Sequence, residues 1–266
     1  MWTRLLCLTV LALGVCETAR ADSGTTRHLL AGVHAFKDGR YEEALVELRV
    51  VARAPDAPAD LAFYLGPTLY KLTRYREALG VFVTSAMTRD ELTELYLGQT
   101  YYQLSLYRKA RAVFVGLRAR GVGPVIGEAA TRYIEAVDAA YQARPDAVVI
   151  DAYVDQAREL APTDPVVAGE IYDEARAVEA LAAAHHRHDE IVAALGATWN
   201  AAGRARAVVD ALSTEPALAP EGSWELARAY RAIGDPGRAR PLLEAIAKGA
   251  GPHAREAAGM LALPAP

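Results

Sequence analysis

The octet "YREALGVF" at residues 75–82 decides the fold, because close relatives of it occur twice more, as "YEEALVEL" at 41–48 and "YRKARAVF" at 107–114. Each octet begins with tyrosine and has an alanine at its fourth position. These alanines, Ala44, Ala78 and Ala110, are 34 and then 32 residues apart. Self-similarity at a period of roughly 20 to 50 residues is typical of proteins that stack one supersecondary unit many times. We therefore expect a repeat array.

The sequence upstream of these octets repeats as well, with "YLGPTLY" at 64–70 and "YLGQTYYQL" at 96–104. Two C-terminal stretches, 195–212 and 222–246, follow a similar scheme. Apolar residues recur at spacings of three and four, which indicates helices, and strand-type alternation is not evident. The order Leu-Gly, aromatic, turn, Tyr and Ala resembles the tetratricopeptide repeat family. The resemblance implies an all-α fold, a right-handed α-solenoid of helix hairpins with five recognisable units.

Small residues in each unit suggest how its two helices meet. Gly66 and Gly98 lack a side chain where the first helix must nearly touch the second, and we expect Ala78 and Ala110 to supply the matching flat surface. Phe82, four residues after its alanine, falls on the same helical face. We expect Phe82 to fill the space towards the following repeat.

The chain divides into five predicted regions. "GVGP" at 121–124 interrupts the pattern with two glycines and a proline, and three further helices are expected at about 124–143, 146–160 and 164–186. The predicted regions are a signal peptide at 1–21, an N-terminal array of three repeats at 22–120, a degenerate helical middle at 121–188, a C-terminal repeat pair at 189–250, and a capping helix with a tail at 251–266.

The first 21 residues are typical of a secretory signal peptide. Arg4 precedes the apolar run "LLCLTVLALGV", and a small-x-small site ends at Ala21. Two alternatives stay open: an uncleaved membrane anchor, and lipid attachment at Cys16, which Val15 disfavours. Only four of the 29 basic residues are lysine, which we interpret as the composition of a high-GC bacterial genome. We expect an exported protein of the periplasm, with no transmembrane span in the mature chain.

Charge and cysteine content exclude several classes of partner. The formal net charge is −4, and nucleic-acid binding is not expected because it requires clustered positive charge. Cleavage after Ala21 would remove both cysteines, Cys7 and Cys16, and with them any disulfide or thiol-based metal site.

No catalytic motif is evident, and no cofactor is expected. The chain has no Gly-x-Ser-x-Gly elbow, no His-Glu-x-x-His helix and no Cys-His pair. One alternative is the helical superstructure of a cell-wall-processing enzyme, whose catalytic carboxylates would have to lie within 124–188. Another is a metal-binding module at His185, His188 and Asp189, whose helical spacing suits zinc. The same residues are also consistent with a solvated turn between helices.

The resemblance assigns one face of the first helix of each hairpin to partner binding. The groove residues that it implies are Leu29, Phe36, Lys37, Phe63, Tyr70, Lys71, Leu95, Gln99 and Tyr102. Phe36, Tyr70 and Tyr102 fall in register, and with the two lysines they would suit an extended or helical peptide. The alternative is that these rings only fill the core. A second, polar groove is expected at Asn200, Trp224, Arg228 and Arg231, where an acidic group could bind.

The sequence therefore predicts a non-enzymatic scaffold or adaptor of the bacterial cell envelope. Its partner would be a peptide or protein segment, bound in the groove of the array.

Overall fold

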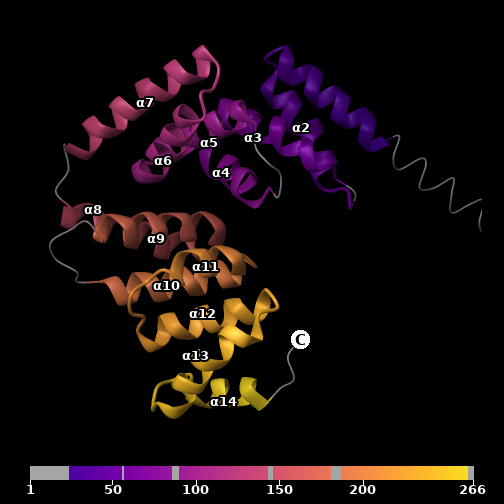
Figure 1. Ribbon diagram of the computed structural model, residues 1–266. Helices are drawn as coiled ribbons and strands as arrows, with labels where there is room; N and C mark the ends of the chain where they lie inside the picture. The colour runs from indigo at the N-terminus through magenta and orange to yellow at the C-terminus, as the bar shows by residue number, and fades with distance from the viewer. Residues whose placement is uncertain (1–23, 56, 86–89, 143–145, 181–186, 263–266) are drawn as a thin grey trace, which may run out of the picture. The chain divides into compact units, whose positions relative to one another are not determined.

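The computed structural model describes residues 24–55, 57–85, 90–142, 146–180 and 187–262, and within these ranges every regular element is a helix (Figure 1). The predicted all-α fold is confirmed. In chain order the helices are one over residues 24–37, α2 (Tyr41–Ala52), the short 3-10 helix η1 (Ala59–Leu61), α3 (Ala62–Lys71), α4 (Tyr75–Thr84), α5 (Glu91–Gln103), α6 (Tyr107–Ala119), α7 (Pro124–Gln142), α8 (Asp146–Leu160), α9 (Pro165–Glu179), α10 (His188–Ala201), α11 (Ala205–Leu212), α12 (Pro220–Ala232), α13 (Pro236–Lys248) and α14 (Ala254–Ala262).

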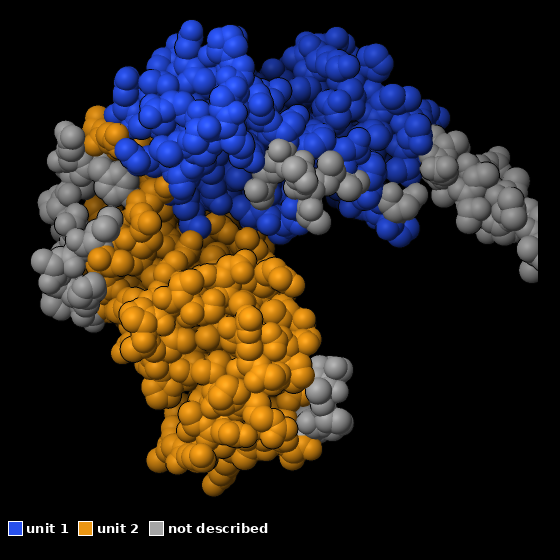
Figure 2. All heavy atoms as spheres, viewed as in Figure 1, with its two compact units in different colours: residues 1–105, 109–135 blue, residues 106–108, 136–266 orange. Residues whose placement is uncertain are grey.

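The chain forms two compact units, which Figure 2 distinguishes. The first comprises Met1–Ser105 and Lys109–Glu135, and the second comprises Leu106–Arg108 and Ala136–Pro266. In the first unit, α3 packs on α2, α4 and α5. The helices thus follow one another as antiparallel pairs with short turns, as the sequence period predicts.

Four hairpins have a glycine in the first helix that lies close to a large side chain sixteen residues later in the second. A Cβ atom on the glycine would lie 2.8 Å from Leu48 Cγ in the first hairpin and 2.6 Å from Phe114 Cε1 in the third. At Gly196 the Cβ would lie 3.3 Å from Leu212 Cδ2, and Glu225 of α12 would be nearer, at 2.6 Å. The four pairs are Gly32 with Leu48, Gly66 with Phe82, Gly98 with Phe114, and Gly196 with Leu212. Because no side chain larger than hydrogen fits in the first three pairs, glycine sets the close approach of the two helices there.

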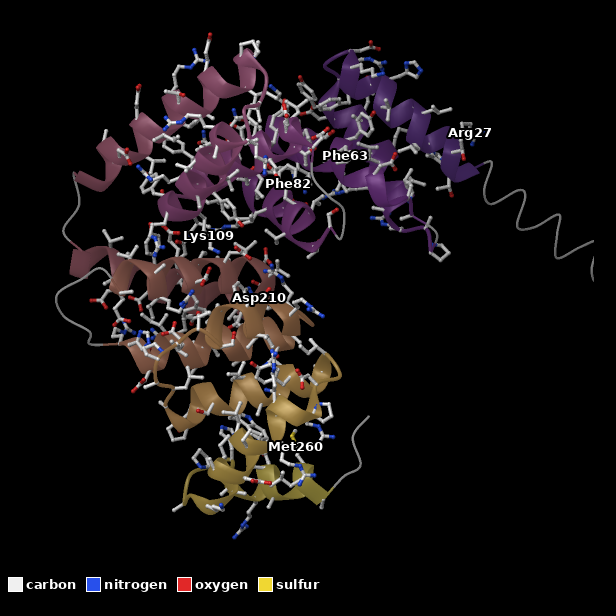
Figure 3. All side chains as sticks on the ribbon, viewed as in Figure 1. Arg27, Phe63, Phe82, Lys109, Asp210 and Met260 are labelled. Atoms are coloured by element: carbon white, nitrogen blue, oxygen red, sulfur yellow. The ribbon has the colours of Figure 1, made fainter. Side chains whose placement is uncertain are left out.

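This packing adds a contact to the expected one. Phe82, which Figure 3 labels, lies against Gly66 of its own hairpin. Ala78 and Phe82 are both fully buried. Phe114 lies against Gly98 in the same way, and it also stacks on Tyr133 of α7, with ring centroids 4.9 Å apart, so it contacts the following helix as well. The alanine provides a small surface, and the bulky side chain one turn later fills the space at the glycine.

The turn inside each hairpin also repeats, with one residue in the left-handed region two positions before the second helix. These residues are Gly39, Thr73, Ser105, Gly203 and Gly234. In the second hairpin the Thr73 amide donates to the carbonyl of Tyr70 at 2.9 Å, and the next amide, Arg74, donates to Leu69 at 2.9 Å. This pair of bonds is a Schellman motif, which satisfies the last carbonyls of the first helix. Three of the five residues are glycine because glycine adopts a positive φ without steric cost.

The middle helices start where the sequence predicts, and α9 ends sooner. α7 and α8 match the expected ranges, whereas α9 ends at Glu179 instead of continuing to 186. Residues 181–186 of that expectation lie outside the described residues. α9 is buried around most of its circumference, and it carries three buried glutamates, Glu170, Glu174 and Glu179.

No helix among the described residues is both long and apolar enough to span a bilayer. The predicted signal peptide at 1–21, including Cys16, lies outside the described residues, and its cleavage stays a prediction.

Candidate functional site

The first unit carries a row of six half-buried aromatic rings, which we call the aromatic row. Its members are Phe36, Tyr64, Tyr70, Tyr96, Tyr102 and Tyr133. The rings meet in three pairs, each joining the end of one helix to a ring on the first helix of the next hairpin or, for the last pair, on α7. Centroids lie 6.1 Å apart for Phe36 and Tyr64, 5.3 Å for Tyr70 and Tyr96, and 5.4 Å for Tyr102 and Tyr133. All three contacts are edge-on, an arrangement that aromatic rings favour.

Local sequence places these rings. Phe36, Tyr70 and Tyr102 each stand three residues before the left-handed turn residue, in the last turn of their helix. In the first two hairpins the tyrosine that begins the second helix contacts the same ring. The ring centroids of Tyr41 and Phe36 lie 5.8 Å apart, and those of Tyr75 and Tyr70 lie 5.4 Å apart. Phe36 and Tyr70 therefore each contact two other rings.

The Tyr70 hydroxyl lies near the middle of this set. It is hydrogen-bonded to Tyr133 and to the side chain of Gln103. Burial, together with the nearby Tyr133 and Tyr75 hydroxyls, raises the pKa of Tyr70 above the usual tyrosine value. Tyr70 therefore stays neutral at physiological pH and keeps its O–H as a hydrogen-bond donor.

Positive charge borders one part of the aromatic row. Lys37 and Lys71, which directly follow Phe36 and Tyr70, are exposed. The Lys71 ammonium lies 5.7 Å from the centroid of the Tyr96 ring, within cation–π range. The corresponding residue of the third hairpin is Gln103, which is exposed and uncharged. The row thus has a cationic border at its first two hairpins and a neutral one at the third.

The other predicted groove residues differ in their exposure. Leu29, Phe63 and Gln99 are half-buried, whereas Leu95 is buried and packs in the core. Leu95 is therefore not part of an accessible surface. The sequence reasoning did not assign Tyr64, Tyr96 or Tyr133 to the site. Tyr64 and Tyr96 had a detectable signal, since each immediately precedes the Leu-Gly pair of its repeat.

The predicted polar groove of the second unit is occupied by the chain's own groups. Asn200 Nδ2 donates to Glu225 Oε2 at 2.7 Å, and Arg228 Nη1 donates to the same oxygen at 3.0 Å. Arg231 Nη1 donates to the carbonyl of Met260 at 2.5 Å. Trp224 is 4 % exposed. Because Glu225 already supplies the carboxylate, an acidic ligand would have to displace it.

His188 and Asp189, the members of the predicted histidine cluster that the structure describes, lie in the first turn of α10. His185 is outside the described residues. The His188 ring lies between two carboxylates, with Nδ1 3.3 Å from Glu179 Oε2 and Nε2 3.3 Å from Glu215 Oε2. Its two nitrogens point at different partners, so they do not converge on one ion, and Asp189 is exposed. No group of three potential metal ligands with suitable geometry occurs in the part of the chain that the structure describes.

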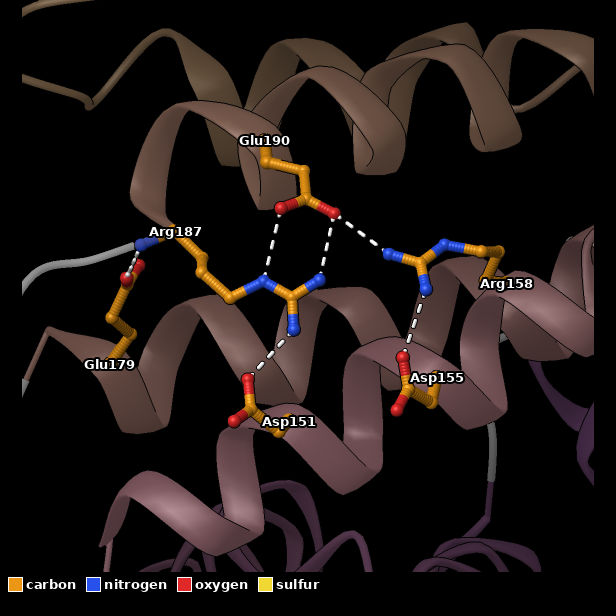
Figure 4. A network of polar contacts seen from close by, with 6 residues as sticks. All are labelled: Asp151, Asp155, Arg158, Glu179, Arg187 and Glu190. Carbon is orange, nitrogen blue, oxygen red and sulfur yellow. Dashed lines mark hydrogen bonds and ion pairs between the residues drawn. The ribbon is translucent and has the colours of Figure 1, made fainter.

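A network of ion pairs lies at this start of α10 (Figure 4). The Arg187 guanidinium donates to Glu190 at 3.0 and 2.9 Å and to Asp151 of α8 at 2.7 Å. Arg158 of α8 also reaches Glu190, at 2.9 Å. Hydrogen bonds from Arg187 are the main cause of a lowered pKa at Glu190. Residues 187–190 therefore connect α8 to α10, which is a structural role.

Comparison with known proteins gives a structural likeness only. No family model matches the chain, and no curated protein matches it. Among solved structures, the TPR domain of P58(IPK) is 14% identical with a TM-score of 0.39, over 92% of this chain and 66% of that one. The TPR2AB domain of yeast Sti1, in complex with pHSP90, is 14% identical with a TM-score of 0.38, over 90% and 97%. The chain thus spans about two thirds of the length of the first of these.

Proposed function

We propose that this protein is a non-enzymatic scaffold that binds a segment of a partner protein along the aromatic row. The observation that carries the proposal is the row itself: six half-buried rings from four helices, which meet in three pairs. Half-buried rings leave apolar area that a partner can cover, and each square ångström so covered contributes about 25 cal/mol.

The rings of the aromatic row keep part of their surface exposed. The interior of the first unit is filled by fully buried side chains such as Leu48, Leu79, Phe82 and Phe114. The rings of the aromatic row are only half-buried, and one of them, Tyr133, stacks on Phe114 at the edge of this interior. Aromatic residues in such positions are the usual hot spots of protein interfaces, because they supply a large contact area at low entropic cost.

We place this scaffold in the bacterial cell envelope. The N-terminal apolar run after Arg4, followed by the site ending at Ala21, supports export, and the arginine-rich composition supports a bacterial source. Exported partner segments are then the expected ligands.

The experiment is photo-crosslinking from position 70 in living cells, followed by mass spectrometry. The Tyr70→Ala/Tyr102→Ala double variant should lose about 2 kcal/mol or more of binding free energy for the captured partner. Leu92→Ala is the matched control, since Leu92 is an exposed apolar residue of α5, the helix that carries Tyr102. Equal affinity of the double variant and the control would contradict the proposal.

A further inference from the structure

A pocket of about 320 Å³ lies in the C-terminal part of the second unit. It is bounded by the start of α12, by the last turns of α13 and by the loop 249–253, which leads into α14 (Figure 1). Most of its wall is apolar, and the larger side chains in it are those of Leu218, Pro220, Leu242, Ile246 and Pro252. Concave apolar surfaces of this size with few polar groups are typical of small-molecule sites.

The imidazole ring of His253 forms a flat part of the wall. One of its faces stacks on Trp224 of α12, with ring centroids 4.7 Å apart and planes 6° apart. Trp224 is buried, whereas His253 is half-buried and lines the pocket. Because Trp224 covers one face, the surface that His253 leaves to the pocket is its other face with the adjoining edge. A planar ring in the pocket would extend the stack of Trp224 and His253, an arrangement that aromatic rings favour.

Ser223 is the one other polar side chain among the described residues that line the pocket. Its hydroxyl donates to the carbonyl of Leu218 at 3.4 Å, which is longer than usual for such a bond. A hydroxyl has one hydrogen and two lone pairs, so the Ser223 oxygen can accept a hydrogen bond while its own hydrogen is engaged. A ligand with an N–H or O–H group would find an acceptor there.

The volume and the rim of the pocket define the ligand further. A cavity of about 150 Å³ holds one benzene molecule, so a pocket about twice as large suits two fused rings. The exposed rim includes Pro220, Ala245 and Pro252, whose side chains form no hydrogen bonds. A peptide laid across this rim would leave backbone amides without side-chain partners, which is costly. The rim therefore favours a free molecule over a ring that a protein segment carries.

We infer that this pocket binds a small, neutral, two-ring aromatic molecule with one N–H or O–H group. One ring stacks on His253, the apolar wall covers the remaining ring surface, and the N–H or O–H group donates to Ser223 Oγ. All residues of the pocket belong to the second unit, whereas the aromatic row belongs to the first. The inference therefore does not rest on the proposed function.

The test is calorimetric titration of the full chain with indole, and benzofuran is the matched control compound because it has the same shape and no N–H group. Indole should bind at one site per chain. Benzofuran should bind about fivefold more weakly, which is the usual effect of one hydrogen bond. Absence of saturable indole binding, or equal affinity of the two compounds, would overturn the inference.

Variants identify the residues responsible. Ala245→Phe should fill the pocket and weaken indole binding about tenfold or more, whereas Ala201→Phe, at another exposed helical alanine of the second unit, should leave it unchanged. His253→Ala should weaken indole about tenfold, and His253→Phe should retain most of the affinity because a flat ring remains. Ser223→Ala should reduce the affinity for indole to that for benzofuran. Circular dichroism of each variant checks that the helices are intact. Equal weakening by Ala245→Phe and Ala201→Phe would contradict the assigned pocket.

Two further titrations exclude other sites and other ligands. The Tyr70→Ala/Tyr102→Ala variant should bind indole as the native chain does, and a loss of binding would move the site to the aromatic row and overturn the inference. N-acetyltryptophanamide carries the same rings on a peptide unit and should bind about fivefold more weakly than indole. Tighter binding of this compound would make a protein side chain the occupant, against the inference. Crosslinking from position 70 should not respond to Ala245→Phe, so each proposal can fail without the other.

Discussion

Phe82 lies directly over Gly66, and its ring occupies the space where any side chain at position 66 would have to go. The same relation, a glycine and a bulky residue sixteen positions later, closes two other hairpins of the first unit, at Gly32 with Leu48 and at Gly98 with Phe114. The packing of the helix pair therefore depends both on the absence of a side chain at Gly66 and on the presence of the Phe82 ring. Substitution at Gly66 is the most direct test of this packing.

Gly66→Ala should destabilise the fold by about 1–3 kcal/mol, because the added methyl group forces the Phe82 ring out of its place. Gly80→Ala is the matched control in the same hairpin, since no atom lies within 4 Å of a Cβ there. Alanine in that helical position should stabilise by about 0.5–1 kcal/mol. Urea unfolding of both variants gives the measurement, and a stable Gly66→Ala protein would refute the contact.

Substitutions at two left-handed turn residues should change the stability of the fold in opposite directions. Thr73 has a φ of 58°, so Thr73→Gly should relieve strain and stabilise the fold by about 0.5–1 kcal/mol. The equivalent glycine of the C-terminal repeat pair, Gly203, has a φ of 71°, and Gly203→Thr should destabilise by about 1–2 kcal/mol. Thermal melts of the two variants should therefore shift in opposite directions. Shifts of the same sign would show that the turn geometry does not control stability here.

Because of Tyr70, we expect the free energy of unfolding to depend on pH in the alkaline range. Because its pKa is raised by burial and by the Tyr133 and Tyr75 hydroxyls, the folded chain keeps a proton that the unfolded chain releases near pH 10. The unfolded state then binds fewer protons, so the free energy of unfolding falls as the pH rises above about 10. Below that pH the contribution is complete. The stability difference between the native protein and Tyr70→Phe should be constant from about pH 7 to 9 and should shrink above about pH 10. Parallel curves through pH 11 would contradict it.

We expect that breaking a buried ion pair of the second unit lowers the free energy of unfolding by a large amount. Arg204 Nη1 lies 2.6 Å from Glu170 Oε1, and the Glu170 side chain is 4 % exposed. Arg204→Leu leaves this carboxylate buried without its cation, which should cost about 3 kcal/mol at neutral pH. Arg204→Leu combined with Glu170→Leu should recover most of the loss. If the double variant were as unstable as the single one, the pair would not be the cause.

The hairpins could be predicted from the sequence because their determinants are local. A Leu-Gly pair and a Tyr-x-x-Ala start both fall within one period, as Leu65-Gly66 and the octet "YREALGVF" illustrate. Thr73 and Ser105 were not recognisable as left-handed residues, since neither favours that conformation by itself. They adopt it because the two flanking helices are already fixed by the packing of Gly66 against Phe82 and of Gly98 against Phe114.

The candidate site was predictable only in part. The register of Phe36, Tyr70 and Tyr102 follows from the repeat period. Their contacts with Tyr64 and Tyr96 depend on how far one helix is shifted along the next, which no single repeat encodes. In the second unit, too, a contact between neighbouring helices could not be predicted from the repeat pattern. Asn200 and Arg228 look available in the sequence, but Glu225 of α12 binds both, and only its contact with Asn200 of α10 depends on the packing of two helices.

A helix pair that is brought together by its own glycine and its own bulky side chain carries the determinants of that packing within one repeat. Tandem duplication of such a segment would therefore supply a new hairpin together with the contact that closes it. The array could then lengthen or shorten by whole hairpins while each hairpin keeps its own closing contact.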